Sequence, residues 1–355
     1  MIFKLRNLCS VITKGTTPST YGFEFVDSGI NFIKSEQLIS SRNVDYSNRY
    51  YISEEAHKRL ARSQLQTNDI LISIAGAYLG KLAIVNGIDI PANTNQAVGI
   101  IRLNSEQLIP LYLFYLLSTD KMRMLIASYN AQSAQPNINL TQLGDLDICV
   151  PNLDEQRHIV NTIGTVDDLI EKKMQIIIKL ENLSKLIYLK HKQQRKGMFP
   201  LGECCDIRTG KLDANAENKD GEYPFFTCGQ EILKINTYAF NCEAIIISGN
   251  GEISVRYHKG KFNAYQRTYV LSPTKYFYLF LEECRLSIDD LKNNSQGSVI
   301  KFITKGMLES IKIVDDSQSA IVNQRIGEVY KTILVLKNEM NFLKEIKSKL
   351  LSKYF

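Results

Sequence analysis

The sequence lacks the short motifs that mark several classes of enzyme. None of its 8 prolines are adjacent, so the Asn-Pro-Pro-Tyr and Asp-Pro-Pro-Tyr motifs of methyl transfer are absent. No Gly-x-x-x-x-Gly-Lys-Ser/Thr phosphate loop occurs either, because the similar segment from Gly76 to Lys81 continues with Leu82, where that loop needs a hydroxyl that binds magnesium. These absences argue against a methyltransferase and against a nucleotide-binding enzyme.

Cysteine spacing and apolar runs exclude further classes. The 7 cysteines include no Cys-x-x-Cys pair, and the 4 histidines show no metal-ligand spacing. We therefore expect reduced thiols, no disulfide framework and no metal site. The longest strongly apolar run, Leu108 to Leu117, is too short to cross a membrane, and the first residues lack the apolar core of a signal peptide. A cytoplasmic protein is expected, and its net charge of +6 suits a polyanion partner without requiring one.

What the sequence does contain is a long helical segment from Pro151 to Lys196, with a single glycine, Gly164. Its apolar residues recur at alternating intervals of four and three, which predicts a coiled-coil seam that needs a partner helix. The seam comprises Ile159, Ile163, Val166, Ile170, Ile177, Leu180 and Ile187, with Lys173, Ser184 and His191 at its remaining positions.

A second helix with the same spacing follows Ser317. Its seam comprises Ile326, Val329, Ile333, Leu336, Met340, Leu343, Lys347, Leu350 and Tyr354. Both helices share non-seam residues in the same order, including an Ile-Gly pair at 163–164 and 326–327. Two long helices can share heptads without common ancestry, but these shared residues favour a duplication. We predict that the two seams pack together antiparallel.

Each helix follows a sheet-rich segment. Residues 1–150 predict a half-buried strand at 69–75, a return strand at 82–85, a strand at 97–103 and a helix at 112–124. Residues 199–314 repeat this order, and Asn93-x-x-Gln96 corresponds to Asn263-x-x-Gln266. The predicted fold is α+β: two similar mixed α/β, sheet-rich domains separated by two long antiparallel coiled-coil helices in a pseudo-twofold repeat. The expected boundaries are 1–150, 151–198, 199–314 and 315–355.

Two related but unlike domains on a stiff spacer suit a ligand with two different sub-sites at a fixed separation. The mildly basic composition favours duplex DNA as that ligand. If the domains lie at opposite ends of the helix pair, their separation sets the number of base pairs between the sub-sites.

The segment Val150-Pro-Asn-Leu-Asp-Glu-Gln156-x-x-Ile-Val160, at the start of the first helix, resembles the conserved region of type I restriction–modification specificity (S) subunits. Gly15-Thr-Thr-Pro-Ser19 and Thr94-Asn-Gln96 resemble motifs of that family's target-recognition domains, and the resemblance covers the whole chain. It implies a non-catalytic subunit that recognises an asymmetric bipartite DNA site. The second helix departs from the pattern, since Val314-Asp-Asp-Ser-Gln318 lacks the proline.

The resemblance also implies partners. These are double-stranded DNA, two modification subunits with adenine methyltransferase activity and, for cleavage, translocating restriction subunits. The chain itself would hold no cofactor, while S-adenosylmethionine, ATP and Mg would be bound by the partner subunits. A fused enzyme and a coiled-coil adaptor that binds only protein are the alternatives, which activity assays and DNA titrations would separate.

Polar and basic residues in the loops of the two domains are the candidates for DNA contact, because base edges and phosphates are recognised by such groups. In the first domain they are Thr16, Thr17, Ser19, Lys34, Ser35, Arg42, Tyr78, Lys81, Asn93, Asn95 and Gln96. In the second they are Lys211, Gln230, Asn250, Arg256, Tyr257, Lys259, Asn263, Gln266 and Arg267.

Some of these residues have a structural alternative. Asn93, Gln96, Asn263 and Gln266 recur in both domains, so they could hold a turn instead of contacting bases. Positions that differ between the domains are better candidates for discrimination, and we align Arg256 and Arg267 with Leu82 and Ala97. Tyr257 could stack on a base or simply pack.

Overall fold

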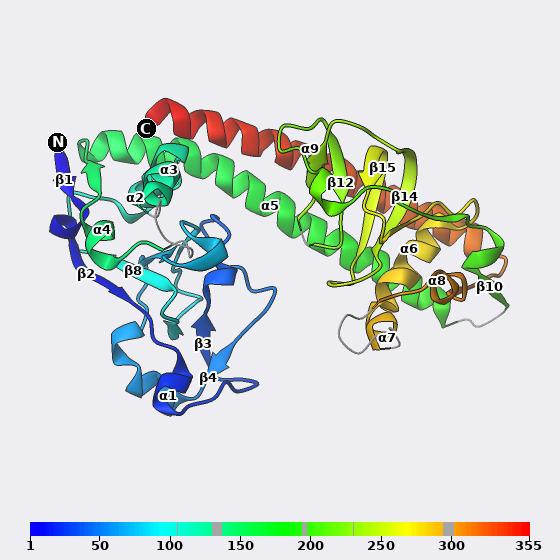
Figure 1. Ribbon diagram of the computed structural model, residues 1–355, viewed down its shortest axis with the longest axis horizontal. Helices are drawn as coiled ribbons and strands as arrows, with labels where there is room; N and C mark the ends of the chain where they lie inside the picture. Colours follow the sequence, from blue (N-terminus) through cyan, green and yellow to red (C-terminus); the bar gives the residue numbers. More distant parts are fainter. Residues whose placement is uncertain (105, 130–136, 194–196, 230, 294–301) are drawn as a thin grey trace. The chain divides into compact units, whose positions relative to one another are not determined.

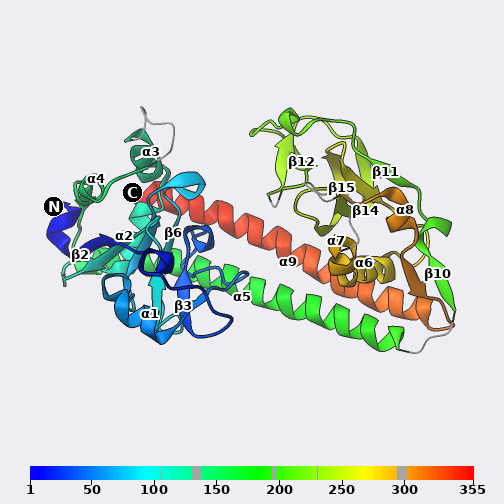
Figure 2. The ribbon, with the colours of Figure 1, turned by 60° about the horizontal axis from the view of Figure 1, so that its bottom comes forward.

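The computed structural model describes residues 1–104, 106–129, 137–193, 197–229, 231–293 and 302–355 (Figures 1 and 2). The chain divides into two compact units. The first consists of residues 1–172 and 340–355, and the second of residues 173–339. Each unit therefore holds one sheet-rich head and part of both long helices. Among the described residues, no helix has the length and apolarity to cross a bilayer.

The first head is built from two sheets and a short strand pair. Their strands are β2 (Cys9–Lys14), β8 (Val98–Leu103), β5 (Ile70–Ser73) and β6 (Leu82–Ile84) in one sheet, β4 (Tyr51–Ile52), β3 (Ile30–Ile33) and β7 (Ala92–Thr94) in the other, and the antiparallel pair β1 (Ile2–Lys4) and β9 (Asp147–Cys149). Its helices are α1 (Glu54–Arg59), α2 (Pro110–Leu117), α3 (Asp120–Ser128) and α4 (Leu140–Gly144).

Strand β5 lies at the centre of this head. Ile70 and Ile72 belong to one apolar core together with α2, whereas Leu71 belongs to a second core on the other face. The expectation that this strand is half-buried was wrong, because its two faces are covered by different cores. An uninterrupted apolar run is the pattern of a strand buried on both faces.

The single helix expected at 112–124 is instead two helices, α2 and α3. Thr119 separates them, because its hydroxyl accepts a hydrogen bond from the backbone NH of Met122 (3.3 Å) and so caps the start of α3. Threonine is a favoured N-cap residue, so Thr119 marks the start of a second helix within the segment 112–124.

The second head repeats the first strand by strand. Its sheet has the order β11 (Ile207–Thr209), β16 (Thr268–Leu271), β14 (Phe240–Ser248), β15 (Val255–Ala264), β12 (Tyr223–Phe226) and β13 (Leu233–Ile235), and β10 (Met198–Pro200) pairs with β17 (Lys312–Val314). Its helices are α6 (Phe277–Leu286), α7 (Ile288–Asn293) and α8 (Lys305–Glu309). The one long strand β15 takes the places of both β6 and β7. The predicted repeat is confirmed.

The two long helices are α5 (Leu153–Lys192) and α9 (Ser319–Tyr354). Every seam position predicted from the sequence is buried or half-buried. Apolar residues away from the seam are left in solvent, for example Leu186, which is 63% exposed, and Phe342, which is 64% exposed. The heptad pattern therefore identified the contact face of both helices.

The helices pair antiparallel within each unit. In the first unit, the Tyr354 hydroxyl lies 3.3 Å from His158 Nε2, and Lys347 Nζ lies 2.7 Å from Asp167 Oδ1. In the second unit, Lys173 Nζ donates to Glu339 (2.5 Å), and Ser319 Oγ lies 3.2 Å from His191 Nε2. Positions late in α9 thus face positions early in α5, as the seams predict.

The Ile-Gly pair of each long helix marks the place where the head's own helix crosses it. A Cβ at Gly164 would lie 3.7 Å from the Tyr115 hydroxyl of α2, and one at Gly327 would lie 2.6 Å from the Tyr278 ring of α6. The glycine at 327 therefore allows a close approach of an aromatic ring that a side chain would prevent.

Candidate nucleic-acid interface

The loops that carry most of the predicted DNA contacts in the first head meet at one edge of its sheets. Register pairs place the ends of β2 and β5 beside the start of β8, through Lys14 with Gly99 and Ser73 with Val98. Strands β3 and β7 are parallel and end together at the pair Ile33 and Thr94. The segments 15–21, 34–37, 74–81 and 95–97 therefore all leave the sheets at the same edge.

The hydroxyl-rich loop after Gly15 is fastened to this edge. The Thr16 amide donates to the Thr94 carbonyl (3.0 Å), and the Thr17 hydroxyl donates to the side chain of Gln96. A Cβ at Gly15 would lie 2.1 Å from the Thr94 carbonyl oxygen, so only glycine permits this approach. Thr17 and Gln96 are thus brought together, and Gln96 remains exposed.

A cation and aromatic rings lie at the same edge. Lys34 Nζ sits 3.4 Å from the centroid of the Tyr50 ring and 4.6 Å from that of Phe25. The Tyr50 hydroxyl donates to Glu36 (2.6 Å), and this hydrogen bond raises the pKa of Tyr50. Further predicted residues of this edge are Ser19, Ser35, Tyr78, Lys81 and Asn95, of which Ser19 and Tyr78 are exposed.

Sequence reasoning missed two arginines near this edge. The Arg62 guanidinium donates to the Thr16 hydroxyl (3.1 Å), and Arg59 lies over the ring of Tyr21, 4.8 Å from its centroid. Both belong to the basic segment 58–62, and this cluster of basic residues could have indicated them as candidates for DNA contact.

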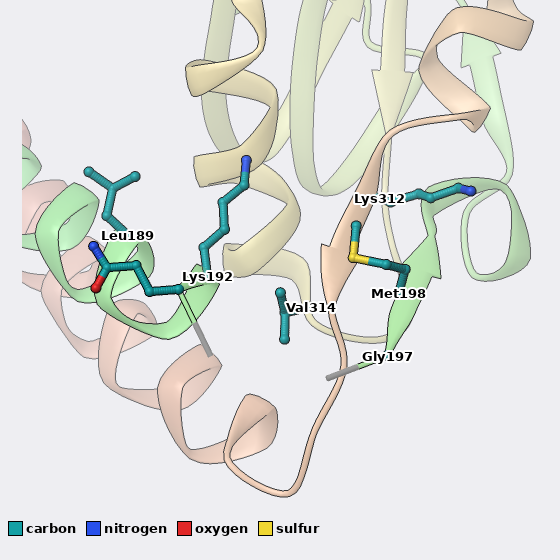
Figure 3. A pocket seen from close by; sticks show the side chains of 7 residues that line it. Leu189, Lys192, Gly197, Met198, Lys312 and Val314 are labelled. Carbon is teal, nitrogen blue, oxygen red and sulfur yellow. The ribbon is translucent and has the colours of Figure 1, made fainter. Parts of the chain in front are cut away.

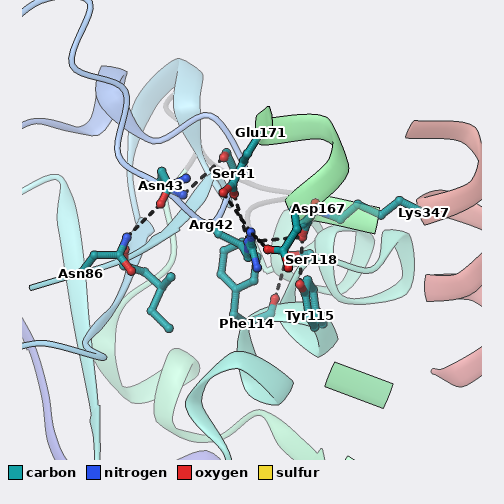
Figure 4. A network of polar contacts seen from close by, with 12 residues as sticks. Ser41, Arg42, Asn43, Asn86, Phe114, Tyr115, Ser118, Asp167, Glu171 and Lys347 are labelled. Carbon is teal, nitrogen blue, oxygen red and sulfur yellow. Dashed lines mark hydrogen bonds and ion pairs between the residues drawn. The ribbon is translucent and has the colours of Figure 1, made fainter. Parts of the chain in front are cut away.

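Two predicted residues of the first head lie away from the edge. The Arg42 side chain, 16% exposed, points to helix α5, where it donates to Asp168 (2.7 Å) and Glu171 (3.0 Å) (Figure 4). These hydrogen bonds raise the pKa of Arg42 against the opposing effect of burial. Asn93 is fully buried, and its amide donates to the Leu60 carbonyl (3.0 Å) and to Ser63 (2.9 Å).

The second head presents an edge of the same construction. A Cβ at Gly210 would lie 1.8 Å from the Ala264 carbonyl oxygen, as one at Gly15 would approach Thr94. The Gln266 amide donates to the Leu212 carbonyl (2.9 Å), and the Gly249 amide donates to the Arg267 carbonyl (2.8 Å). The predicted residues gathered here are Lys211, Asn250, Arg256, Gln266 and Arg267, of which Lys211, Gln266 and Arg267 are exposed.

The strand registers also correct one alignment. Arg256 pairs with Ile246 of β14, and the matching position of the first head, paired with Leu71, is Ala83 and not Leu82. Arg267 does match Ala97, because each carbonyl accepts from the residue after the central strand, Gly249 or Ile74. The heads therefore differ by an arginine for an alanine at two places.

The remaining predictions in the second head lie elsewhere. Tyr257 donates to Glu243 (2.5 Å) and packs against the Tyr330 ring of α9, with centroids 5.2 Å apart. Asn263 is buried like Asn93, and Lys259 is an exposed residue in the middle of β15, opposite Glu243. Gln230 lies outside the described residues.

A cavity in the second unit does not resemble a catalytic site. It has a volume of about 850 Å³ and lies between the end of α5 and the β10–β17 pair (Figure 3). Its lining residues are Leu189, Lys192, Gln193, Gly197, Met198, Lys312 and Val314. Lys192 already donates to Glu283 (2.8 Å). Among the described residues, no group of three His, Cys, Asp or Glu side chains could hold a metal ion.

Comparison with known families identifies the repeat. The model of the type I restriction modification DNA specificity domain matches residues 1–182 and again residues 195–314. The chain belongs to this family. The resemblance expected from the sequence is confirmed.

Individual specificity subunits agree with this assignment. The chain is 45% identical over 123 residues to the EcoDI specificity subunit of Escherichia coli, a match that covers 34% of the chain and 27% of that relative. It is 26% identical to the putative MjaX specificity subunit of Methanocaldococcus jannaschii over 89% of the chain and 84% of the relative. The chain thus matches about a third or less of the Escherichia coli relatives.

A solved structure supports the fold of this specificity chain. The S subunit of a type I restriction–modification system from M. genitalium aligns over 100% of this chain and 96% of its own, with a TM-score of 0.56 and 18% identity. At that identity the likeness concerns the fold alone.

Proposed function

We propose that this chain is the DNA specificity subunit of a type I restriction–modification complex, and that each head recognises one half of an asymmetric bipartite site. The observation that carries the proposal is the pair of equivalent edges. Both are built on the same glycine-dependent loop, yet they present different side chains, such as Arg267 in one and Ala97 in the other. A shared frame with different edge residues suits recognition of two different base sequences.

The proposed recognition domains are residues 1–150 and 199–314, and the proposed spacers are residues 151–198 and 315–355. The antiparallel pairing within each unit supports a spacer that holds the heads apart and so sets the gap between the half-sites. We leave Arg42, Asn93, Tyr257 and Asn263 out of the proposed DNA contacts, because their polar atoms are occupied inside the protein.

We further propose that two modification subunits and, for cleavage, restriction subunits bind this chain in the cytoplasm. Helix α5 in the second unit leaves several aliphatic side chains in solvent. Ile176, Ile178, Leu183 and Leu186 are 45% to 63% exposed. Exposed apolar surface of this kind marks binding sites for other proteins. Methyl transfer and cleavage would then be carried out by the partners.

A salt titration tests DNA binding. The chain, alone and with its modification subunits, is titrated against its target duplex at several salt concentrations. Each phosphate contact contributes a slope of about −0.9 in log affinity against log salt. Lys211→Ala, at the exposed edge of the second head, should reduce the magnitude of this slope by about one phosphate contact, whereas Arg157→Ala, on the exposed face of α5 and paired with Asp154, should leave it unchanged. A chain that binds its subunits but no DNA would be the protein-binding adaptor instead.

Exchange of one head tests whether each head recognises its own half of the DNA site. Residues 1–150 are replaced by the first head of another specificity subunit, and adenine methylation is mapped across the host genome. Only one half of the recognised sequence should change. A change in both halves would refute independent recognition by the two heads.

A further inference from the structure

A buried charge cluster joins three elements of the first unit. Asp167 of α5 is 6% exposed, and its carboxylate accepts from Lys347 of α9 at 2.7 and 3.0 Å. It also accepts from the Tyr115 hydroxyl of α2 at 2.9 Å, and Arg42 Nε lies 3.9 Å away (Figure 4). Head and both helices thus meet at one carboxylate.

Lys347 is the one charged residue among the predicted seam positions of α9. Every other position carries an apolar residue or tyrosine. Its side chain is only 15% exposed, so its ammonium depends on a carboxylate partner. A buried charge without its partner is strongly unfavourable, whereas apolar seam contacts are interchangeable. A polar residue at one seam position is a known way to select a register.

Heptad seams allow the helices to slip by seven residues at little cost in apolar contact. After a slip in one direction, Ile163 would face Leu343 where it now lies near Leu350, so one leucine replaces another. Asp167 would then face Met340, and Lys347 would face Val160. Lys347 would then be buried without a carboxylate partner, and Asp167 would keep only the Tyr115 hydroxyl and Arg42. The ring of Phe355, 5.2 Å from that of Tyr112, also favours the observed register in the first unit. In the second unit the register is favoured by buried Glu282, which accepts from Ser184 of α5 and from Tyr330 of α9.

We infer that Asp167 and Lys347 are positioning residues that select the register of α5 against α9 in the first unit. The role rests on the proposed function in one respect, since a register matters for specificity only if the helices set the gap between half-sites. One heptad is about 10 Å of helix, which corresponds to about three base pairs of 3.4 Å. A lost register would therefore let the chain accept sites with more than one gap length.

Thiol cross-linking in the purified full chain measures the register without DNA. Ile163→Cys with Leu350→Cys reports the observed register, and Ile163→Cys with Leu343→Cys reports the slipped one, when the cross-linking reagent spans less than the roughly 10 Å of one heptad. The cross-linked peptides are identified by mass spectrometry, so the 7 native cysteines can stay. In the parent chain only the first pair should cross-link.

The decisive background is Asp167→Asn with Lys347→Met, which removes both charges and still lets residue 167 accept from Tyr115. The slipped cross-link should rise at least about tenfold. Asp154→Asn, which breaks an exposed ion pair with Arg157 within α5, is the control and should change nothing. An unchanged ratio in the neutral variant, folded by circular dichroism, overturns the inference. If that variant does not fold, Lys347→Met alone is measured, with the same two outcomes.

Mapping of methylated sites then separates the two proposals. A neutral variant that slips in the cross-linking assay should methylate sites with additional gap lengths. If the register slips but the gap stays constant, the register inference stands and the spacer part of the proposed function fails.

Discussion

The two heads have the same strand order but differ in the strands that follow the central one, β6 and β7 in the first head and β15 in the second. In the first head, β6 ends at Ile84 and β7 begins at Ala92, and the two lie in separate sheets. In the second head, β15 runs without a break from Val255 to Ala264, so one sheet replaces two. The loop edge is nevertheless the same in both. A fixed glycine and a fixed strand order are enough to hold this edge, while the outer strands are free to vary.

The largest expected effect tests whether the two edges are equivalent. Gly15→Ala and Gly210→Ala each drive a methyl group into a backbone carbonyl, at 2.1 and 1.8 Å, so each should lower the free energy of unfolding by about 3 kcal/mol or more. Gly87→Ala and Gly306→Ala meet no atom within 4 Å and serve as controls. Urea denaturation measures all four. Tolerance at one edge only would break the comparison.

The next effect compares the polar contacts of the two units. Asp167→Ala leaves Lys347 without its carboxylate and should cost about 3 kcal/mol. Ser184→Ala removes one hydroxyl that donates to buried Glu282, which still accepts from Tyr330 (2.6 Å), and should cost about 1 kcal/mol. Thermal unfolding of both variants gives the difference. Equal losses would contradict the view that the buried Asp167 carboxylate stabilises the first unit more than the Ser184 hydroxyl stabilises the second.

Opposite signs are expected where each head crosses its long helix. Gly327→Ala places a methyl group 2.6 Å from the Tyr278 ring and should destabilise by about 1 to 2 kcal/mol. Gly164→Ala has 3.7 Å to the Tyr115 hydroxyl and should stabilise by up to about 1 kcal/mol, because alanine favours a helix over glycine. Chemical denaturation decides between them, and a matching sign would show that the two crossings are packed alike.

The smallest expected effect is on the pH dependence of stability, and it concerns the second head alone. Burial lowers the pKa of His258, which packs against the rings of Phe226 and Phe262. Because the unfolded chain binds this proton more readily, the contribution of neutral His258 is present above the ordinary histidine pKa of 6.5 and is lost as pH falls below it. The matching position of the first head is the buried Val85.

His258→Val should therefore flatten the fall in melting temperature between pH 7 and pH 5. The other histidines are present in both proteins and cancel in the comparison. Identical pH profiles would show that His258 remains free to take up a proton in the folded chain.

The sequence predicted the parts of this fold that depend on periodicity. Heptads identified the buried face of α5 and α9, because a seam residue and a solvent residue differ in polarity at every turn. The fusion of β6 and β7 into β15 could not be foreseen, since strand continuity depends on which neighbour pairs with residues 259–262. Thr119 was a local signal that the apolar run concealed.

The loops that form the candidate site could be predicted from the sequence, but the side chains that they expose could not. The loop after Gly15 was predicted from its motif, but the close backbone approach at Gly15 and Gly210 is seen only in the structure. Whether a polar side chain is exposed depends on its neighbours in space, and Arg42 illustrates this, because its acidic partners lie more than 120 residues away in α5. Asn93 is polar yet buried, because Leu60 and Ser63, in the segment that follows helix α1, supply its hydrogen-bond partners.

The short antiparallel ribbons β1–β9 and β10–β17 give each head a closed neck. The chain enters and leaves a head through adjacent strands, as in the pairing of Met198 with Val314 immediately before α9. A different sheet whose first and last strands pair in the same way could therefore replace a head while α5 and α9 stay unchanged. Recombination at these necks would let a gene acquire a new head in a single exchange.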